Sequence, residues 1–152
     1  IIKITLEIDD VEYEFDAFED FTEGLKQIGE AIVQDHDERI SAGLGVNMKP
    51  LEKLEKKTIN RKKAAGYEQP ATPLFATGTM KKLILKSPKR NKVEVRVSAL
   101  RDKIGNWHQT GKANNKLRKW FGISDRVAAF IAGAITQEIQ RKINIATDKG
   151  VG

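Results

Sequence analysis

The residues with the clearest chemical potential lie in the stretch PLFATGTMKK, which runs from residue 73 to residue 82. A threonine and a glycine followed by lysines suggest a loop that binds phosphate. Such a loop needs the pattern GxxxxGK[ST] between a strand and a helix. Here Gly78 is followed by Thr-Met-Lys-Lys, no second glycine stands at the required spacing, and the next segment has the pattern of a strand. We therefore predict that Thr77 and Gly78 form a turn where a loop meets a strand.

The histidines and the acidic residues are the other candidates for catalysis or metal binding. His108 has no marked nucleophile or orienting acid around it, so we expect it to hydrogen-bond the backbone. His36 lies within Asp-His-Asp-Glu at residues 35–38. Consecutive residues of a helix point in different directions, so we expect a histidine at the edge of the core rather than a metal ligand. The carboxylates between residues 7 and 23 could serve a nuclease, but they fall on a predicted hairpin and helix start, which is a weak metal site.

The chain contains no cysteine, which excludes disulfides, thiol catalysis and cysteine zinc sites. With two histidines, a metal site made of imidazoles alone is nearly excluded as well. We expect a protein that is not an enzyme, with no catalytic residues, no cofactor and no bound metal.

Charge is divided unevenly along the chain, although the net charge is +6. Residues 1–38 hold 13 acidic and 2 basic residues, whereas residues 39–152 hold 8 acidic and 25 basic residues. The two parts could neutralise each other within one chain, the acidic part of one copy could face the basic part of another, or the basic part could face nucleic acid. Opposite charges on one chain suit head-to-tail assembly. The residues that we expect to contact either DNA or a neighbouring subunit are Lys53, Lys57, Arg61, Lys62, Lys81, Lys82, Lys89 and Arg90.

The first part of the chain has the pattern of a hairpin followed by a long helix. Residues 2–8 and 11–15 alternate between apolar and polar side chains, which predicts a β-hairpin. We expect Asp16 to cap the helix and Gly43 to end it. Apolar residues recur at every third or fourth position of this helix, and His36 falls in the same row, which consists of Phe18, Phe21, Leu25, Ile28, Ile32, His36 and Ile40.

The remaining elements are a basic helix, a second hairpin and a final helix. We expect Pro50 to start the basic helix and Gly66 to close it, with a loop over residues 66–79. Residues 82–87 and 92–98 are predicted to form the hairpin. Ser124 is expected to cap the final helix, whose apolar stripe consists of Val127, Ile131, Ala134, Ile135, Ile139 and Ile143.

These elements predict an α+β fold, in which antiparallel β-hairpins form a small sheet with a long N-terminal helix and a C-terminal helix packed on it. We expect a single domain over residues 1–145, with residues 1–15 as an acidic β-hairpin extension and residues 146–152 as a flexible tail. No apolar run approaches the roughly 20 residues that a membrane helix needs, and no signal peptide is visible, so we expect no membrane association.

Three segments resemble, in the same order, the virion-morphogenesis or tail-completion family of Mu-like tailed phages. IGEAIV at residues 28–33 is similar to IGEALV in the family's first helix. TINRKK at residues 58–63 and PLFATGTM at residues 73–80 resemble the stretch TxxARK…PLxxTGxL. WHQTG at residues 107–111 resembles IHQFG, and LRKWFGIS at residues 117–124 resembles ARPFLGLS, which precedes a terminal helix in that family.

The resemblance covers roughly residues 21–143 and implies a structural function in the virion. Proteins of this family act late in assembly at the neck, or head–tail junction, where they complete the tail and enable head–tail joining. The implied partners are further copies of the chain in a ring, commonly hexameric, together with connector or stopper proteins and tail-tube or terminator proteins. DNA that passes through the lumen is a further partner that the resemblance leaves open. The implied location is the neck or tail of the virion, after assembly in the host cytoplasm.

The resemblance also implies structural or assembly roles for ten residues: Thr77, Gly78, Trp107, His108, Gln109, Gly111, Arg118, Trp120, Phe121 and Gly122. His108, Gln109 and Gly111 would hold a second turn against residues 77–78. Trp107, Trp120 and Phe121 would anchor either the core or a subunit interface.

An alternative function is that of a basic nucleic-acid-binding or architectural protein, because the lysine clusters could line a phosphate track. Aromatic residues make up 7% of the chain, which argues against a stacking platform for single strands.

Overall fold

The computed structural model describes residues 3–7, 21–73, 80, 82–89, 91–97, 109, 111 and 118–151. Within these ranges the three strands β1 (Lys3–Glu7), β2 (Leu83–Leu85) and β3 (Lys92–Val97) form an antiparallel sheet in the order β1-β3-β2. With the helices described below, this sheet confirms the predicted α+β fold.

The alternating valines of β3 point to the buried face of the sheet. Val93, Val95 and Val97 are buried, and Leu83 and Leu85 of β2 lie opposite Val97 and Val95. This register confirms the predicted hairpin between β2 and β3, because the apolar residues of both strands face the same side.

The first strand joins the same sheet, a pairing that the sequence did not predict. Ile4 lies opposite Val95 and Leu6 opposite Val93, so β1 is an edge strand of the central sheet. The expected partner of this strand, residues 11–15, lies outside the described residues. The part of the predicted extension that the structure describes therefore belongs to the main sheet.

Helix α1 (Thr22–Ala42) covers the apolar face of the sheet with its predicted stripe. The side chains in this stripe that are buried are those of Phe21, Leu25, Ile28, Ile32, His36 and Ile40. Gly29 marks the closest approach, because a Cβ atom placed there would lie 2.5 Å from Cδ1 of Leu85.

The end of α1 was predicted correctly and its start was not. Gly43 adopts the left-handed conformation at φ 71°, its N–H donates to the carbonyl of Ile40, and the N–H of Leu44 donates to the carbonyl of Arg39. This pair of bonds is the Schellman arrangement. The helix begins at Thr22, later than predicted, and the carbonyl of Phe21 accepts a hydrogen bond from Leu25 N–H at 2.9 Å. The predicted cap, Asp16, lies outside the described residues.

Helix α2 (Lys56–Ala64) also begins later than expected, five residues beyond Leu51. The N–H of Leu51 donates to the carbonyl of Gly43, and the carbonyls of Glu52 and Lys53 accept hydrogen bonds from Arg118. Because these backbone groups already have partners, the helix starts after them. Gly66 follows the helix at φ 78°, as expected for its C-terminal end.

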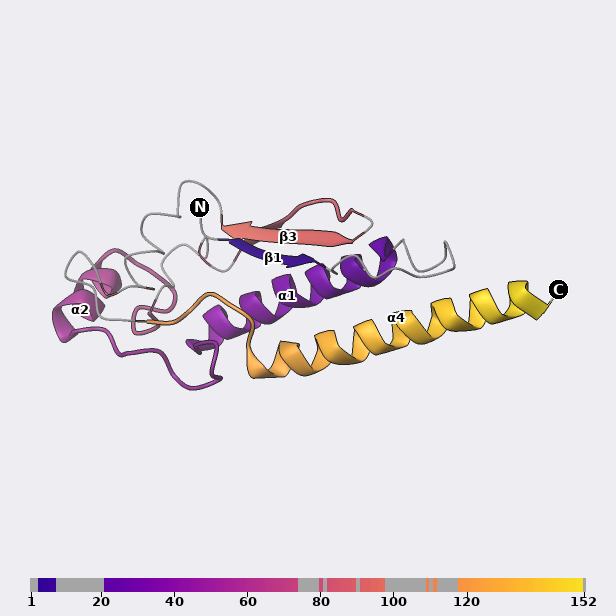
Figure 1. Cartoon of the computed structure of the whole chain (residues 1–152). Coiled ribbons are helices and arrows are strands. Elements are labelled where there is room, and N and C mark those ends of the chain that lie inside the picture. The colour runs from indigo at the N-terminus through magenta and orange to yellow at the C-terminus, as the bar shows by residue number, and fades with distance from the viewer. Residues whose placement is uncertain are drawn as a thin grey trace.

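Helix α4 (Asp125–Val151) packs against α1 and runs antiparallel to it, so that α1 lies between the sheet and α4 (Figure 1). The Oγ of Ser124 accepts a hydrogen bond from Val127 N–H at 3.1 Å, which confirms the predicted cap. The segment from residue 146, predicted as a flexible tail, continues this helix to Val151. It contains no proline, and its one glycine within the helix is the penultimate helical residue.

Candidate functional site

The side chain of Gln109 holds the backbone of the segment that leads into α4. Its Nε2 donates to the carbonyl of Phe121 at 3.0 Å, and its Oε1 accepts from the N–H groups of Trp120 at 3.1 Å and Phe121 at 3.3 Å. A side-chain amide can do this because it carries both a donor and an acceptor. The role predicted for Gln109 was to hold a turn against residues 77–78, which lie outside the described residues.

The aromatic residues of this segment lie in the core of the single chain. Trp120 is fully buried, and Phe121 is nearly so. Their rings are 5.5 Å apart between centroids, and the ring of His36 lies 5.4 Å from Trp120 and 6.1 Å from Phe121. Of the two roles left open for Trp120 and Phe121, the structure therefore favours core packing over a subunit interface.

Two predicted glycines near this segment have positive φ angles. Gly111 has φ 71°, and Gly122 has φ 150°. A Cβ atom at Gly122 would lie 3.3 Å from Cγ1 of Val46, so both backbone conformation and space favour glycine there.

His36 is buried within the core rather than at its edge. Its Nε2 lies 2.8 Å from the carbonyl of Met80, which makes Nε2–H the donor and leaves Nδ1 without a partner among the described residues. Burial lowers the pKa of His36 from 6.5 to about 4, because a charged imidazolium would be taken out of water. His36 therefore joins α1 to the segment before β2 as a neutral hydrogen-bond donor.

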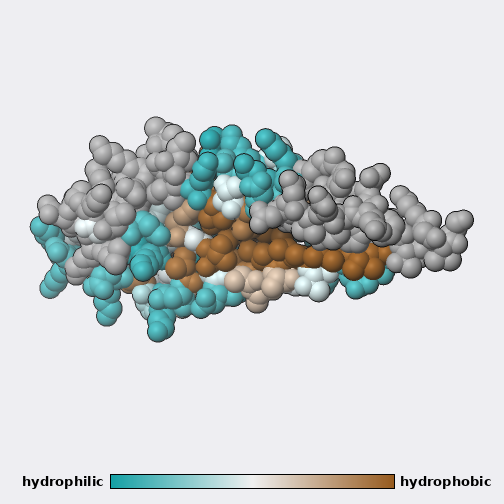
Figure 2. Space-filling view, viewed as in Figure 1, coloured by the Kyte–Doolittle hydropathy of each residue, from teal (hydrophilic) through white to brown (hydrophobic). Residues whose placement is uncertain are grey.

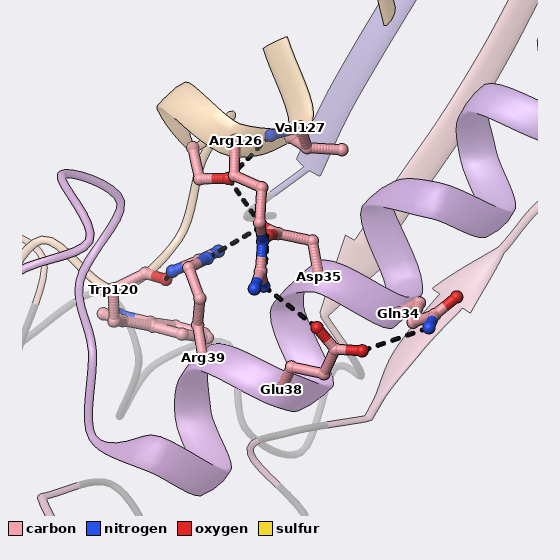
Figure 3. A network of polar contacts seen from close by, with 8 residues as sticks. Gln34, Asp35, Glu38, Arg39, Trp120, Arg126 and Val127 are labelled. Carbon is pink, nitrogen blue, oxygen red and sulfur yellow. Dashed lines mark hydrogen bonds and ion pairs between the residues drawn. The ribbon is translucent and has the colours of Figure 1, made fainter. Parts of the chain in front are cut away.

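Asp35 is the centre of a polar network that links α1 to the start of α4 (Figure 3). Its Oδ2 accepts from Nε of Arg39 and from Oγ of Ser124, both at 2.8 Å. Its Oδ1 accepts from Nε of Arg126 at 2.9 Å and lies 2.7 Å from a second nitrogen of that guanidinium. The other end of Arg39 donates to the carbonyl of Trp120 at 3.0 Å.

This network explains the charge state of Asp35. Burial alone would raise the pKa of the carboxyl group, but the hydrogen bonds from Arg39, Arg126 and Ser124 outweigh it and hold the pKa below its ordinary value of 3.8. Asp35 is thus a buried, charged structural residue with its acceptor capacity in use. In the described part of the chain no cluster of three or more histidine, aspartate or glutamate residues could hold a metal ion.

The sequence did not predict that Asp35, Arg39, Ser124 and Arg126 form one hydrogen-bonded network. A signal for part of it was present, because Asp35 follows Ile28 by seven residues and Ile32 by three, which places it on the buried face of the helix. Arg39 follows Asp35 by four residues, the spacing of an ion pair within a helix. The partners on α4 lie about ninety residues away and had no local signal.

Arg118 is buried and donates hydrogen bonds to two backbone carbonyls of the segment before α2. Its Nε donates to Glu52 at 2.7 Å, and a terminal nitrogen donates to Lys53 at 3.2 Å. Burial lowers the pKa of this guanidinium from its ordinary value, and Glu52 opposes that effect. In the structure, Arg118 therefore ties the segment before α4 to the segment before α2.

Of the predicted basic contact residues that the structure describes, all but one have exposed side chains. Lys53, Lys57, Arg61, Lys82 and Lys89 are exposed. Lys62 is buried, and its Nζ donates to the carbonyl of Thr72 at 2.8 Å, so the structure contradicts its assignment as a contact residue. We call the exposed charges on and just before α2 the α2 basic face, which consists of Lys53, Lys56, Lys57, Arg61 and Lys63.

An exposed row on α1 carries the opposite charge, and we call it the α1 ridge, which consists of Gln27, Glu30, Gln34 and Glu38. A groove of about 280 Å³ on one side of it is lined by three ridge residues, Glu30, Gln34 and Glu38, and by Val33, Asp37 and Leu85. A groove of about 410 Å³ on the other side is lined by the ridge and by residues that include Val127 and the exposed Phe130. Figure 2 shows hydrophobic residues in a band along the region of α4, and hydrophilic residues at the end of the molecule that holds α2.

Six of the predicted site residues lie outside the described residues: Thr77, Gly78, Lys81, Arg90, Trp107 and His108. Their predicted roles stay predictions.

Comparisons with known protein families, with curated proteins and with solved structures give no match to this chain. Among the described helices, none is long and apolar enough to cross a membrane.

Proposed function

We propose that this chain is a non-enzymatic structural protein of a tailed-phage virion, of the neck or tail-completion type. It forms a ring at the head–tail junction, completes the tail and enables head–tail joining. The observation that carries the proposal is that Met80 and Ser124, which end the second and third segments of the family resemblance, both contact the helix that holds the first segment. Segments that are far apart in sequence and support each other's position are what a shared fold requires.

The contacts within this joint support the proposal in detail. Asp35 and His36 follow the first segment, residues 28–33, on the same helix. His36 bonds Met80, the last residue of the second segment, and Asp35 bonds Ser124, the last residue of the third. Gln109 bonds Trp120 and Phe121 within the third segment.

The surface charges support assembly as the mode of action. The α1 ridge and the α2 basic face are both exposed, and they lie on different helices of one chain. A chain with two different complementary patches associates head to tail, and such contacts close into rings when the rotation allows it. The proposed partners are accordingly further copies in a hexameric ring, the connector or stopper, and tail-tube or terminator proteins in the neck or tail of the virion.

Electron microscopy of the purified chain in negative stain tests this function. We expect rings of uniform size with a central channel, formed by the protein alone or on the ends of isolated tails. Monomers that form no ring and add to no tail end would overturn the proposal.

A nucleic-acid-binding function is the second candidate, and the exposed α2 basic face with Lys82 and Lys89 favours it. Each neutralised phosphate adds about 0.9 to the slope of log affinity against log salt on duplex DNA. Duplex binding by the monomer with a slope of several units would favour this candidate over ring assembly.

A further inference from the structure

The α1 ridge has the features of a docking site for a basic helix. Glu30 is exposed at its centre, and Glu23, Asp37 and Glu38 add carboxylates on the same side of α1. Among the described residues, the cations near these carboxylates are Lys26 on α1, Arg126, which pairs with Asp35 and with Glu38 at 3.1 Å, and Arg141, which pairs with Glu138 and interacts with Glu23. With Asp35 and Glu138 counted beside Arg39, the carboxylates of this surface still outnumber the cations.

The two grooves beside the ridge add apolar surface to this charge. Val33 and Leu85 line one groove, and Val127 and Phe130 line the other. Phe130 is 48% exposed, which is unusual for an aromatic side chain of this size in the described part of the chain. An aromatic group in a groove beside charged residues is typical of the anchor points of protein interfaces.

The α2 basic face has the complementary features. Five basic side chains are exposed on and just before this helix, and Tyr67, 37% exposed, follows its end. The helix has 9 residues. At about 1.5 Å per residue it is roughly 14 Å long, which suits a helix that lies in a surface groove.

The ridge and the basic face do not meet within one chain. Helix α2 lies beyond the C-terminal end of α1 (Figure 1). Glu30 is 12 residues from Ala42, the last residue of α1, which corresponds to about 18 Å along the helix axis. Among the described residues, no ion pair joins the α1 ridge to the α2 basic face, so both surfaces are open to a partner.

We propose that the α2 basic face of one copy docks on the α1 ridge of a second copy, with Phe130 beside the contact. This inference rests on the proposed function and deepens it, because it names the surfaces that join neighbouring subunits. Each copy contributes a different surface to each of its two neighbours, which is the requirement for a heterologous ring. A second copy is favoured over nucleic acid because phosphate would explain the basic face alone and would be repelled by the ridge.

Charge reversal on each surface tests the proposal. One variant carries Gln27→Lys and Glu30→Lys, and the other carries Lys57→Glu and Arg61→Glu; all four side chains are exposed, so the fold is retained. We expect each variant alone to associate at least about tenfold more weakly than the unchanged chain, because like charges then face each other. Mixing the two variants restores association, because each contact between one variant and the other pairs opposite charges. The control is Glu7→Lys, an exposed reversal on β1 away from both surfaces, which leaves association unchanged.

Disulfide trapping tests the contact directly, since the chain has no cysteine of its own. One preparation carries Gln34→Cys on the ridge and the other carries Asn60→Cys on α2, so any disulfide between them joins two copies. We expect the mixture to give a covalent dimer of twice 17.0 kDa under mild oxidation. A mixture of Asn60→Cys with Thr136→Cys, on the side of α4 that faces away from α1, gives far less.

The outcomes separate this inference from the proposed function. If the unchanged chain forms rings that both charge-reversed variants also form, and the cysteine pair stays unlinked, the named surfaces are wrong and ring assembly stands. If the unchanged chain is a monomer whose DNA binding is lost with Lys57→Glu and Arg61→Glu, both the surfaces and the ring are overturned.

Discussion

At the scale of single residues, Asp35 has the largest expected effect on stability. Its carboxylate is the partner of Arg39, whose side chain is 1% exposed, and it fixes the hydroxyl that caps α4. Removing one partner of a buried ion pair leaves the other charge without compensation, which costs about 3–5 kcal/mol.

We predict that Asp35→Asn lowers the free energy of unfolding by about 3 kcal/mol. For a chain of this length that corresponds to a fall in Tm of roughly 6–12 °C. Thermal unfolding followed by circular dichroism measures the change. The control variant is Glu30→Gln, which removes one negative charge from an exposed side chain. A similar Tm for both variants would mean that the network in Figure 3 contributes little to stability.

His36 predicts a dependence of stability on pH. Its pKa is about 4 in the folded chain against 6.5 as the ordinary value, so between these pH values the unfolded chain binds a proton that the folded chain does not. The free energy of unfolding therefore falls as the pH is lowered from 6.5 to about 4, at up to about 1.4 kcal/mol per pH unit. The contribution of Asp35, whose folded pKa is depressed, is lost at lower pH, below its ordinary value of 3.8.

Urea unfolding at a series of pH values between 4 and 6.5 checks this prediction. We expect His36→Gln to remove most of the slope. An unchanged slope in His36→Gln would assign the pH dependence to other groups.

At the scale of the elements, two helical glycines offer a test of packing. A Cβ atom at Gly133 of α4 would meet nothing within 4 Å, whereas one at Gly29 of α1 would lie 2.5 Å from Leu85 and 3.1 Å from Val93. The same substitution should therefore have opposite effects at the two positions.

We predict that Gly133→Ala raises the free energy of unfolding by about 0.5–1 kcal/mol, because alanine is the better helix former. Gly29→Ala lowers it by about 1–3 kcal/mol, because the added methyl group overlaps the side chain of Leu85 and crowds that of Val93, which must shift in the core. Urea unfolding of both variants at one pH measures the two changes. Changes of the same sign would contradict the close contact between α1 and the sheet.

The sequence predicted those parts of the elements that depend on local patterns. The stripe from Phe21 to Ile40, the glycine at the end of α1 and the Ser124 cap are each defined by residues within a few positions of one another, and all are observed. The predicted start of α2 was wrong because Arg118, more than sixty residues away, donates hydrogen bonds to the backbone carbonyls just before the helix.

The pairing of β1 with β3 and the partners of Asp35 escaped prediction for the same reason. They join segments about ninety residues apart, and no local pattern encodes such contacts. Of the candidate site, the sequence identified Gln109, Arg118 and Trp120 through the family resemblance, whereas the hydrogen bonds that give these residues their roles became visible in the structure.

In the whole molecule, the described residues form one buried joint and two charged surfaces. The joint around Asp35, His36 and Trp120 fixes α1 against α4 and against the segment that precedes β2. Arg118 in turn ties the segment before α2 to the segment before α4, through the carbonyls of Glu52 and Lys53. A fixed geometry between two complementary surfaces is what allows identical copies to close into one ring of defined size.

The molar mass of the unchanged chain in solution shows whether copies assemble through the two charged surfaces. Light scattering coupled to size exclusion measures it at low salt and at about 1 M salt, where the screening length is about 3 Å. We expect the molar mass to be one defined multiple of 17.0 kDa at low salt and to shift toward 17.0 kDa at high salt. A mass of 17.0 kDa at every protein and salt concentration would contradict it.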